Sequence, residues 1–128
     1  MPPRKSIQIS AAESIVMQVV WDHDSISTED VIAALEKHGK WQAATVKTLL
    51  NRLLKKGAVR ARKDGRRYLY SAVLTRKEWV ATESHGFLDR MFGGRVAPLV
   101  SYFSEHKKLG KKDIDDLKKL LRELDDGR

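Results

Sequence analysis

The hydrophobic pattern changes its period once along the chain, and this change constrains the fold more than any other feature. Between residues 10 and 57, three segments repeat apolar residues at helical spacing. From Ala58 onward, apolar and charged residues alternate as in a β-strand, and Asp64-Gly65 interrupts the alternation. An Asp-Gly pair between alternating segments is typical of a tight hairpin turn, whose two central residues need positive φ. The sequence therefore predicts three helices and a hairpin, the element order of a winged helix-turn-helix.

Capping signals predict where the three helices begin and end. Ser10 and Glu13 have the spacing of a capping box, so the first helix should begin there. Ser27 is the predicted N-cap of a second, short helix that Gly39 stops. The third helix follows after a few residues and should end at Gly57. Two helices joined by a tight turn that contains glycine indicate a helix-turn-helix.

The third predicted helix has an apolar side and a polar side. The apolar residues, which should face the core, are Val46, Leu49, Leu50 and Leu53. Opposite them are the residues that we expect to read DNA bases: Thr45, Lys47, Thr48, Asn51 and Arg52. A helix about 10–12 Å across fits the major groove of B-DNA, where threonine, asparagine and arginine all have partners on the base edges. An ordinary polar surface helix is the alternative interpretation.

Basic residues are concentrated around this helix and the hairpin. Residues 40–67 contain ten Lys or Arg and one acidic residue, so the rest of the chain is close to neutral although its total net charge is +8. Such a concentration suits a surface that binds a polyanion, because each neutralised phosphate releases counterions; a merely solvated charged face is the alternative. The residues that we expect to contact the DNA backbone are Lys55, Lys56, Lys63, Arg66 and Arg67.

A second group of helical patterns occupies the remainder of the chain. Thr75 and Glu78 form another capping box, and Gly93-Gly94 should end the helix that begins there. A shorter helix and a last helix over residues 109–124 follow, and the last one has the apolar spacing of a coiled-coil seam. The residues assigned to dimerisation are Phe103, Ile114, Leu117, Leu120, Leu121 and Leu124. We predict a mainly α fold with a small hairpin wing: a DNA-binding domain at 1–74 and a helical dimerisation domain at 75–128.

Several function classes are not expected from this composition. The chain has no Cys, which excludes disulfides, thiolate metal sites and a cysteine nucleophile. Its four His are scattered, and only the loose grouping of Glu83, His85 and Asp89 resembles a ligand set, so we expect no metal, no cofactor and no catalytic residue. No apolar run is long enough for a signal peptide or a membrane span, so the cytoplasm is the expected location. Of the remaining aromatic residues, Trp21, Trp41 and Trp79 are expected to pack in the core, and Tyr68 and Tyr70 in the core or against the hairpin.

A series of motifs follows one another along residues 7–124. They are Glu13 with 15–17 and Trp21, then Trp41, 45–49, 51–53 and 55–57, then 68–70, then 87–90 with 92–94, then 99–100, and last 113–114 with Leu117, Leu120 and Leu121. In the order of these motifs the chain resembles the penicillinase-repressor family of bacterial transcription factors, the BlaI/MecI group with its copper-responsive CopY branch.

The resemblance implies a repressor that binds a palindromic operator as a dimer. It places the base-reading positions at Thr45, Thr48 and Arg52, with Lys47 nearby, in agreement with the polar side of the predicted helix. In the antibiotic-responsive branch a membrane sensor with a metalloprotease domain leads to cleavage at an Asn-Phe bond, and the matching place here is Tyr102-Phe103, without the Asn. The copper-responsive branch senses metal through Cys-x-Cys pairs, which this chain lacks.

These patterns predict a homodimeric, sequence-specific transcriptional repressor. Two-fold symmetry would place two recognition helices about 34–36 Å apart on an inverted repeat. Cleavage or loosening of residues 93–110 should then release the DNA. A sequence-indifferent architectural protein, a winged helix that binds proteins and a repressor that senses a small ligand are the alternatives.

Overall fold

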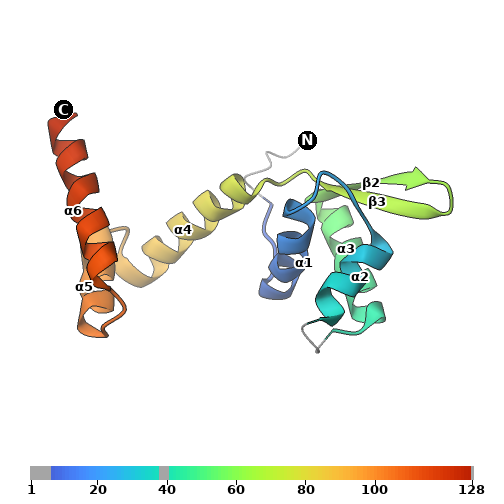
Figure 1. Ribbon diagram of the computed structural model, residues 1–128, viewed down its shortest axis with the longest axis horizontal. Helices are drawn as coiled ribbons and strands as arrows, with labels where there is room; N and C mark the ends of the chain where they lie inside the picture. Colours follow the sequence, from blue (N-terminus) through green and yellow to red (C-terminus); the bar gives the residue numbers. More distant parts are fainter. Residues whose placement is uncertain (1–6, 38–40, 128) are drawn as a thin grey trace. The chain divides into compact units, whose positions relative to one another are not determined.

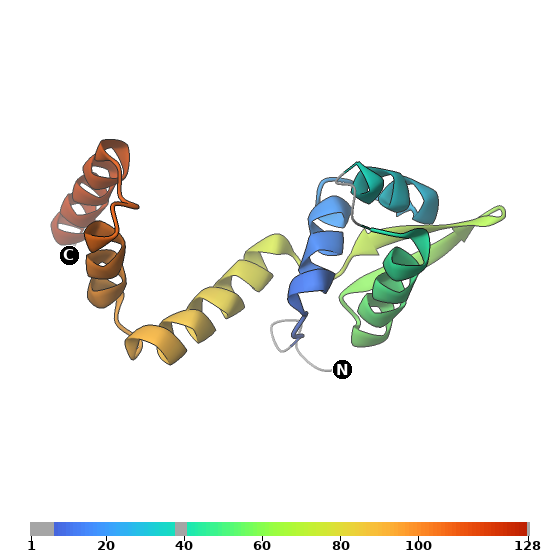
Figure 2. The same cartoon turned by 90° about the horizontal axis from the view of Figure 1, so that it is seen from below.

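The computed structural model describes residues 7–37 and 41–127, and their contacts divide the chain into two units that meet between Glu83 and Ser84. The first unit contains α1 (Ala11–Trp21), β1 (Ile26–Ser27), α2 (Thr28–Glu36), α3 (Ala43–Lys56), β2 (Val59–Asp64), β3 (Arg67–Ala72) and the start of α4 (Arg76–Phe92). The second contains the rest of α4, α5 (Val96–Glu105) and α6 (Lys111–Asp126). Figures 1 and 2 show the hairpin of β2 and β3, here called the wing, extending beyond α1, α2 and α3.

The first unit confirms the predicted winged helix-turn-helix. Its antiparallel sheet has the order β1-β3-β2, with Ile26 opposite Tyr70 and Ala61 opposite Tyr70 on the other side. Four apolar residues of α3 are buried beneath the sheet and the other two helices: Val46, Leu49, Leu50 and Leu53. Burying such side chains contributes roughly 1.5–3 kcal/mol each, so the apolar side of α3 is fixed inward and its polar side is left outside.

The predicted boundaries of the first three helices are confirmed where the structure describes them, whereas the last helix spans Lys111–Asp126 instead of residues 109–124. In α1 the Glu13 amide donates to Ser10 Oγ at 3.0 Å and the Ser10 amide donates to Glu13 Oε1 at 2.7 Å, which completes the capping box. Ser27 caps α2, while the predicted stop at Gly39 lies outside the described residues. Helix α3 ends at Gly57 with φ at +80°, a left-handed conformation that favours glycine.

The turn of the wing differs from the prediction in one respect. Asp64 pairs with Arg67, so the two loop residues are Gly65 and Arg66 rather than Asp64 and Gly65. Of these two, only Gly65 has positive φ, at +65°, and glycine at the first central position is the signature of a type II′ turn. The tight hairpin is confirmed. The prediction that both central residues of the turn have positive φ was wrong, because Asp64 pairs with Arg67 and so belongs to β2.

The start of α4 packs with the first unit. Thr75 and Glu78 form the predicted reciprocal cap, with the Thr75 amide 2.9 Å from Glu78 Oε1 and the Glu78 amide 3.1 Å from Thr75 Oγ1. Trp79 lies against Trp21 with 5.4 Å between the ring centroids, and Trp21 Nε1 donates to the carbonyl of Leu74 at 2.8 Å. Packing along this edge therefore extends the first unit past residue 74 to residue 83.

A buried carboxylate connects α1 to the end of α3. Glu13 is 1% exposed, and Lys56 Nζ lies 2.6 Å from its Oε1. Burial raises the pKa of Glu13, but the hydrogen bond from Lys56, the hydrogen bonds from Ser10 and the charge of Lys56 together outweigh burial and lower the pKa below its ordinary value of 4.5. Glu13 therefore stays ionised inside the fold.

Replacing Lys56 with Met is expected to lower the free energy of unfolding at pH 7 by about 1–3 kcal/mol, because a buried carboxylate loses its charged partner. Wild-type stability gained from the lowered pKa is present above pH 4.5 and is lost as the pH falls through the folded-state pKa of Glu13. The deficit of the variant should therefore shrink at acid pH, as measured by urea unfolding at several pH values. Lys55→Met, which removes an exposed neighbouring lysine, is the matched control. A deficit that persists unchanged at pH 3 would contradict this account.

The second unit has no buried residue among positions 84–127. Helices α5 and α6 lie side by side (Figures 1 and 2) and enclose an apolar groove of about 370 Å³, called here the α5/α6 groove. Its lining residues are Leu99, Val100, Phe103, Leu109, Asp113, Asp116, Leu117 and Leu120. Gly93 and Gly94, both with positive φ, end α4 before this pair of helices, as predicted.

Candidate nucleic-acid interface

The polar side of α3 is exposed. All five residues predicted to read bases lie on it: Thr45, Lys47, Thr48, Asn51 and Arg52. The structure divides them between two flanks of the helix. Thr45, Thr48 and Arg52 line one shallow hollow of about 290 Å³, and Lys47 and Asn51 line another, which lies between α3 and the wing. The spacing of Thr45, Thr48 and Arg52 predicts that they lie along one line of the helix, and the structure confirms this; Lys47 and Asn51 lie beside the wing instead.

On the first flank, Thr48 has its hydroxyl proton engaged. Its Oγ1 donates to the carbonyl of Ala44 at 3.0 Å, one turn earlier in α3. The hydroxyl oxygen still has acceptor capacity, and the methyl group remains available for apolar contact. Arg52, one turn further along the same flank, provides a planar pair of donors that suits guanine O6 and N7. This flank thus combines an acceptor, a methyl group and a bidentate donor.

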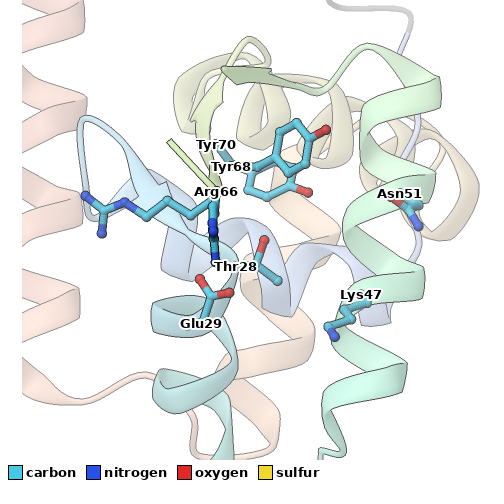
Figure 3. Close-up of a pocket in the computed structure, with 8 residues that line it drawn as sticks. Thr28, Glu29, Lys47, Asn51, Arg66, Tyr68 and Tyr70 are labelled. Carbon is cyan, nitrogen blue, oxygen red and sulfur yellow. The ribbon is translucent and has the colours of Figure 1, made fainter. Parts of the chain in front are cut away.

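The second flank faces a hollow of about 280 Å³ between α3, the start of α2 and the wing, called here the wing hollow (Figure 3). Its lining residues are Thr28, Glu29, Lys47, Asn51, Arg66, Arg67, Tyr68 and Tyr70. Core packing is confirmed for Tyr70, which is 7% exposed, whereas Tyr68 is 49% exposed and lies outside the core. The two share one face of β3, and Tyr68 lies beyond the end of the core, so it lines the wing hollow instead.

The basic residues expected at the DNA backbone do not all carry free charges. Lys56 is bound to Glu13, and Arg67 NH2 lies 3.3 Å from Asp64 Oδ2 in an exposed pair. Lys55, Lys63 and Arg66 are exposed, and no carboxylate of the described residues pairs with them. Lys63 lies opposite Tyr68 in the wing, and Arg66 lies at its tip. Unpaired positive charge is therefore greatest at the wing and at the end of α3.

In the described parts of the chain, no group of three or more His, Asp or Glu side chains gathers as metal ligands, and the grouping of Glu83, His85 and Asp89 does not form such a site. None of the helices in those parts is long and apolar enough to cross a membrane.

The residues assigned to dimerisation divide between the groove and the outer surface of the second unit. Phe103, Leu117 and Leu120 line the α5/α6 groove. Ile114, Leu121 and Leu124 are not among its lining residues and are 41%, 62% and 63% exposed. The outer surface of α6 therefore presents leucines to solvent at the predicted spacing.

The bond at the predicted cleavage position lies inside α5. Tyr102 is 48% exposed, and its ring stacks on His106 with 4.1 Å between centroids and meets Phe103 edge-on at 5.5 Å. The Tyr102-Phe103 bond is thus held in helical conformation one turn before the end of α5.

Comparison with known proteins gives one consistent result. A family model described as Penicillinase repressor matches residues 9–123. The penicillinase repressor of Bacillus licheniformis is 38% identical over 120 residues, covering 94% of this chain and 94% of that protein. The methicillin resistance regulatory protein MecI of Staphylococcus aureus (strain N315) is 28% identical over 117 residues, covering 91% and 95%. These relatives are named as repressors and regulators, not as enzymes.

Solved structures support the same assignment. The DNA-binding domain of the repressor BlaI matches with a TM-score of 0.52 and 43% identity, over 56% of this chain and 88% of that one. The monomeric form of Bacillus licheniformis BlaI, solved in complex with the blaP half-operator, matches with a TM-score of 0.50 and 44% identity, over 56% and 87%. The family model matches well over half of this chain, and the chain therefore belongs to the penicillinase repressor family.

Proposed function

We propose that the chain is a homodimeric transcriptional repressor that binds an inverted repeat in duplex DNA through α3 and the wing, in the cytoplasm, where the bacterial chromosome lies. One observation carries this proposal: α3 buries four of its five leucine and valine side chains and exposes all five predicted base-reading residues. The similarity to BlaI, whose monomeric form was solved with a half-operator, supports the same use of this surface.

The second unit supplies the argument for a dimer. None of its described residues is buried, and three of its large apolar side chains, Met91, Leu121 and Leu124, are each more than 60% exposed. A unit this small gains little stability from its own packing when it has no core, and two copies can bury these residues against each other. The occupant that we propose for the apolar surface of α6 is therefore the same surface of a second copy.

Release follows from the same arrangement. If the α6 surfaces hold two DNA-binding units together, separating them returns each unit to the affinity of a single half-site. We propose cleavage or loosening of residues 93–110 as the means, with a membrane sensor metalloprotease pathway as the upstream partner. The Tyr102-Phe103 bond is helical, and a protease needs an extended segment, so α5 must open locally before this bond is cut.

Sequence specificity is tested by selecting binding sites from a pool of random duplexes with the full chain. The proposal predicts a consensus that is an inverted repeat with half-site centres about 10 base pairs apart. A sequence-indifferent architectural protein would return no consensus, and that outcome would reject the proposal in favour of this alternative.

Lys63→Ala and Arg66→Ala are each expected to weaken binding to the selected site and to a scrambled duplex by the same factor. Both side chains are exposed cations without an ion pair in the described structure, and phosphate contacts carry no sequence information. Each variant should also reduce the slope of log affinity against log salt by about 0.9 for every phosphate that the variant no longer neutralises. Binding isotherms at several salt concentrations measure this. Lys77→Ala, an exposed cation on α4, is the control, and an unchanged slope in the wing variants would show that the wing does not contact phosphate.

A further inference from the structure

The wing hollow contains more hydrogen-bonding groups than base reading by α3 requires. Thr28 and Glu29 begin α2, and Lys47 projects from the facing side of α3. Figure 3 shows the rings of Tyr68 and Tyr70 extending from the wing towards α3, with their hydroxyls at that end. Three elements that are distant in sequence thus direct hydroxyl groups and a cation into one small space.

Tyr70 is the most informative of these residues. Only 7% of it is exposed, and its ring belongs to the core, yet its hydroxyl has no hydrogen-bond partner within the described structure. The hydroxyl of a tyrosine with a buried ring normally finds a partner, and at this position solvent in the wing hollow can supply one. A phenylalanine would fill the core equally well, so the hydroxyl at the wall of the wing hollow is available to donate a hydrogen bond to a ligand that displaces this solvent.

The groups around the hollow select an anion of low charge. Tyrosine and threonine hydroxyls donate hydrogen bonds, Lys47 adds positive charge, and the first turn of an α-helix favours a negative group. The exposed carboxylate of Glu29 lies at the same hollow and opposes negative charge. A phosphodiester, which carries one negative charge, is therefore favoured over a free phosphate, which carries more.

We propose that the wing hollow binds one phosphodiester group of the DNA backbone, held by the hydroxyls of Tyr68, Tyr70 and Thr28 and by Lys47. This inference rests on the proposed function and assigns to the hollow a role distinct from the Thr45, Thr48 and Arg52 flank. The contact fixes the depth and register of α3 in the groove. Because most of its donors are neutral, it adds affinity with little salt dependence.

The first test uses Tyr68→Phe and Tyr70→Phe in the full chain, with Tyr102→Phe as the matched control in the second unit. Each of the first two variants is expected to bind a duplex with a single half-site about tenfold more weakly, and a scrambled duplex more weakly by the same factor. The salt slope should not change, because no charge is removed. Thermal unfolding of Tyr70→Phe should match wild type, since the hydroxyl has no partner among residues 7–37 and 41–127; if this variant instead fails to fold, Tyr68→Phe decides the test.

The second test locates the phosphate. Neutral methylphosphonate groups are placed one at a time along the half-site, and affinity is measured for wild type and for Tyr68→Phe. At one position the methylphosphonate should weaken DNA binding by wild type several-fold and leave DNA binding by Tyr68→Phe almost unaffected, because the two changes remove the same contact. Equal losses of affinity in both proteins at every position would overturn the inference.

Two further outcomes separate the possible explanations. If inorganic phosphate shifts the tyrosine ring resonances at submillimolar concentration while Tyr68→Phe leaves DNA binding unchanged, the hollow serves a free anion and the inference is wrong. If wild type shows no preference for any duplex, the proposed function itself fails. If wild type binds its selected site specifically and the two tyrosine variants bind DNA with the same affinity as wild type, only the proposal of a phosphodiester site is wrong.

Discussion

Replacing both Leu121 and Leu124 with Asp is expected to convert the protein to a monomer and to weaken binding to the complete inverted repeat by about 10²- to 10⁴-fold. The two leucines are 62% and 63% exposed in a single chain, so carboxylates there do not disturb the fold of one protomer. The introduced carboxylates would place negative charges in the centre of the proposed dimer, where the free-energy cost of desolvating an unpaired charge prevents association. Affinity for a single half-site should stay near the wild-type value, since the DNA-binding unit is untouched.

Sedimentation equilibrium and duplex titration measure the two effects together. Lys119→Asp introduces the same carboxylate on α6 outside the apolar spacing and should leave both the oligomeric state and the affinity close to wild type. Circular dichroism checks that α6 remains helical in every variant. A double variant that remains dimeric, or a monomer that binds the inverted repeat as tightly as wild type, would show that α6 does not join the two copies.

Replacing Thr48 and Arg52 with Ala is expected to remove most of the discrimination between the selected site and a scrambled duplex. Each well-formed contact to a base edge contributes about 1–3 kcal/mol of discrimination, and the dimer makes every contact twice. Both residues are exposed on the flank of α3 that faces away from the wing hollow, so replacing them should not alter the fold. Competition titrations with single base-pair changes give the specificity ratio at each position.

The control for this variant is Lys55→Ala, which removes an exposed charge from the same helix. Lys55→Ala should weaken binding to all duplexes by the same factor and leave the specificity ratio unchanged, because a phosphate contact does not distinguish sequences. If the Thr48 and Arg52 variant also weakens all duplexes by one common factor, α3 positions the protein on DNA without reading it.

Local signals were sufficient for most of the fold. The capping box at Ser10, the left-handed Gly57 and the glycine pair at 93–94 each act within one helical turn, and the structure has all three as predicted. The apolar stripe of α3 fixed its orientation, because burying four large side chains outweighs any competing preference of the polar side. The exposure of the predicted base-reading residues follows directly from that stripe.

Sequence patterns could not predict interactions between segments that are distant in the chain. In the sequence, Lys56 is one more cation of a basic segment, and only the packing of α1 on α3 brings it to Glu13. Tyr68 and Tyr70 look equivalent in the strand alternation, yet the core ends between them, so one is buried and the other is exposed. The wing hollow likewise needs α2, α3 and the wing together, and no single segment indicates it.

The central claim is that the polar side of α3 enters the major groove twice in each assembly. A scan of 7-deazapurines through the selected site tests it most directly, because each substitution removes one acceptor from the major groove and leaves base pairing intact. The account predicts weaker binding at two clusters of positions whose centres lie about 10 base pairs apart, and weakening at fewer positions in each cluster for the Thr48 and Arg52 variant. Weakening confined to a single cluster, or affinity that is indifferent to every substitution, would contradict it.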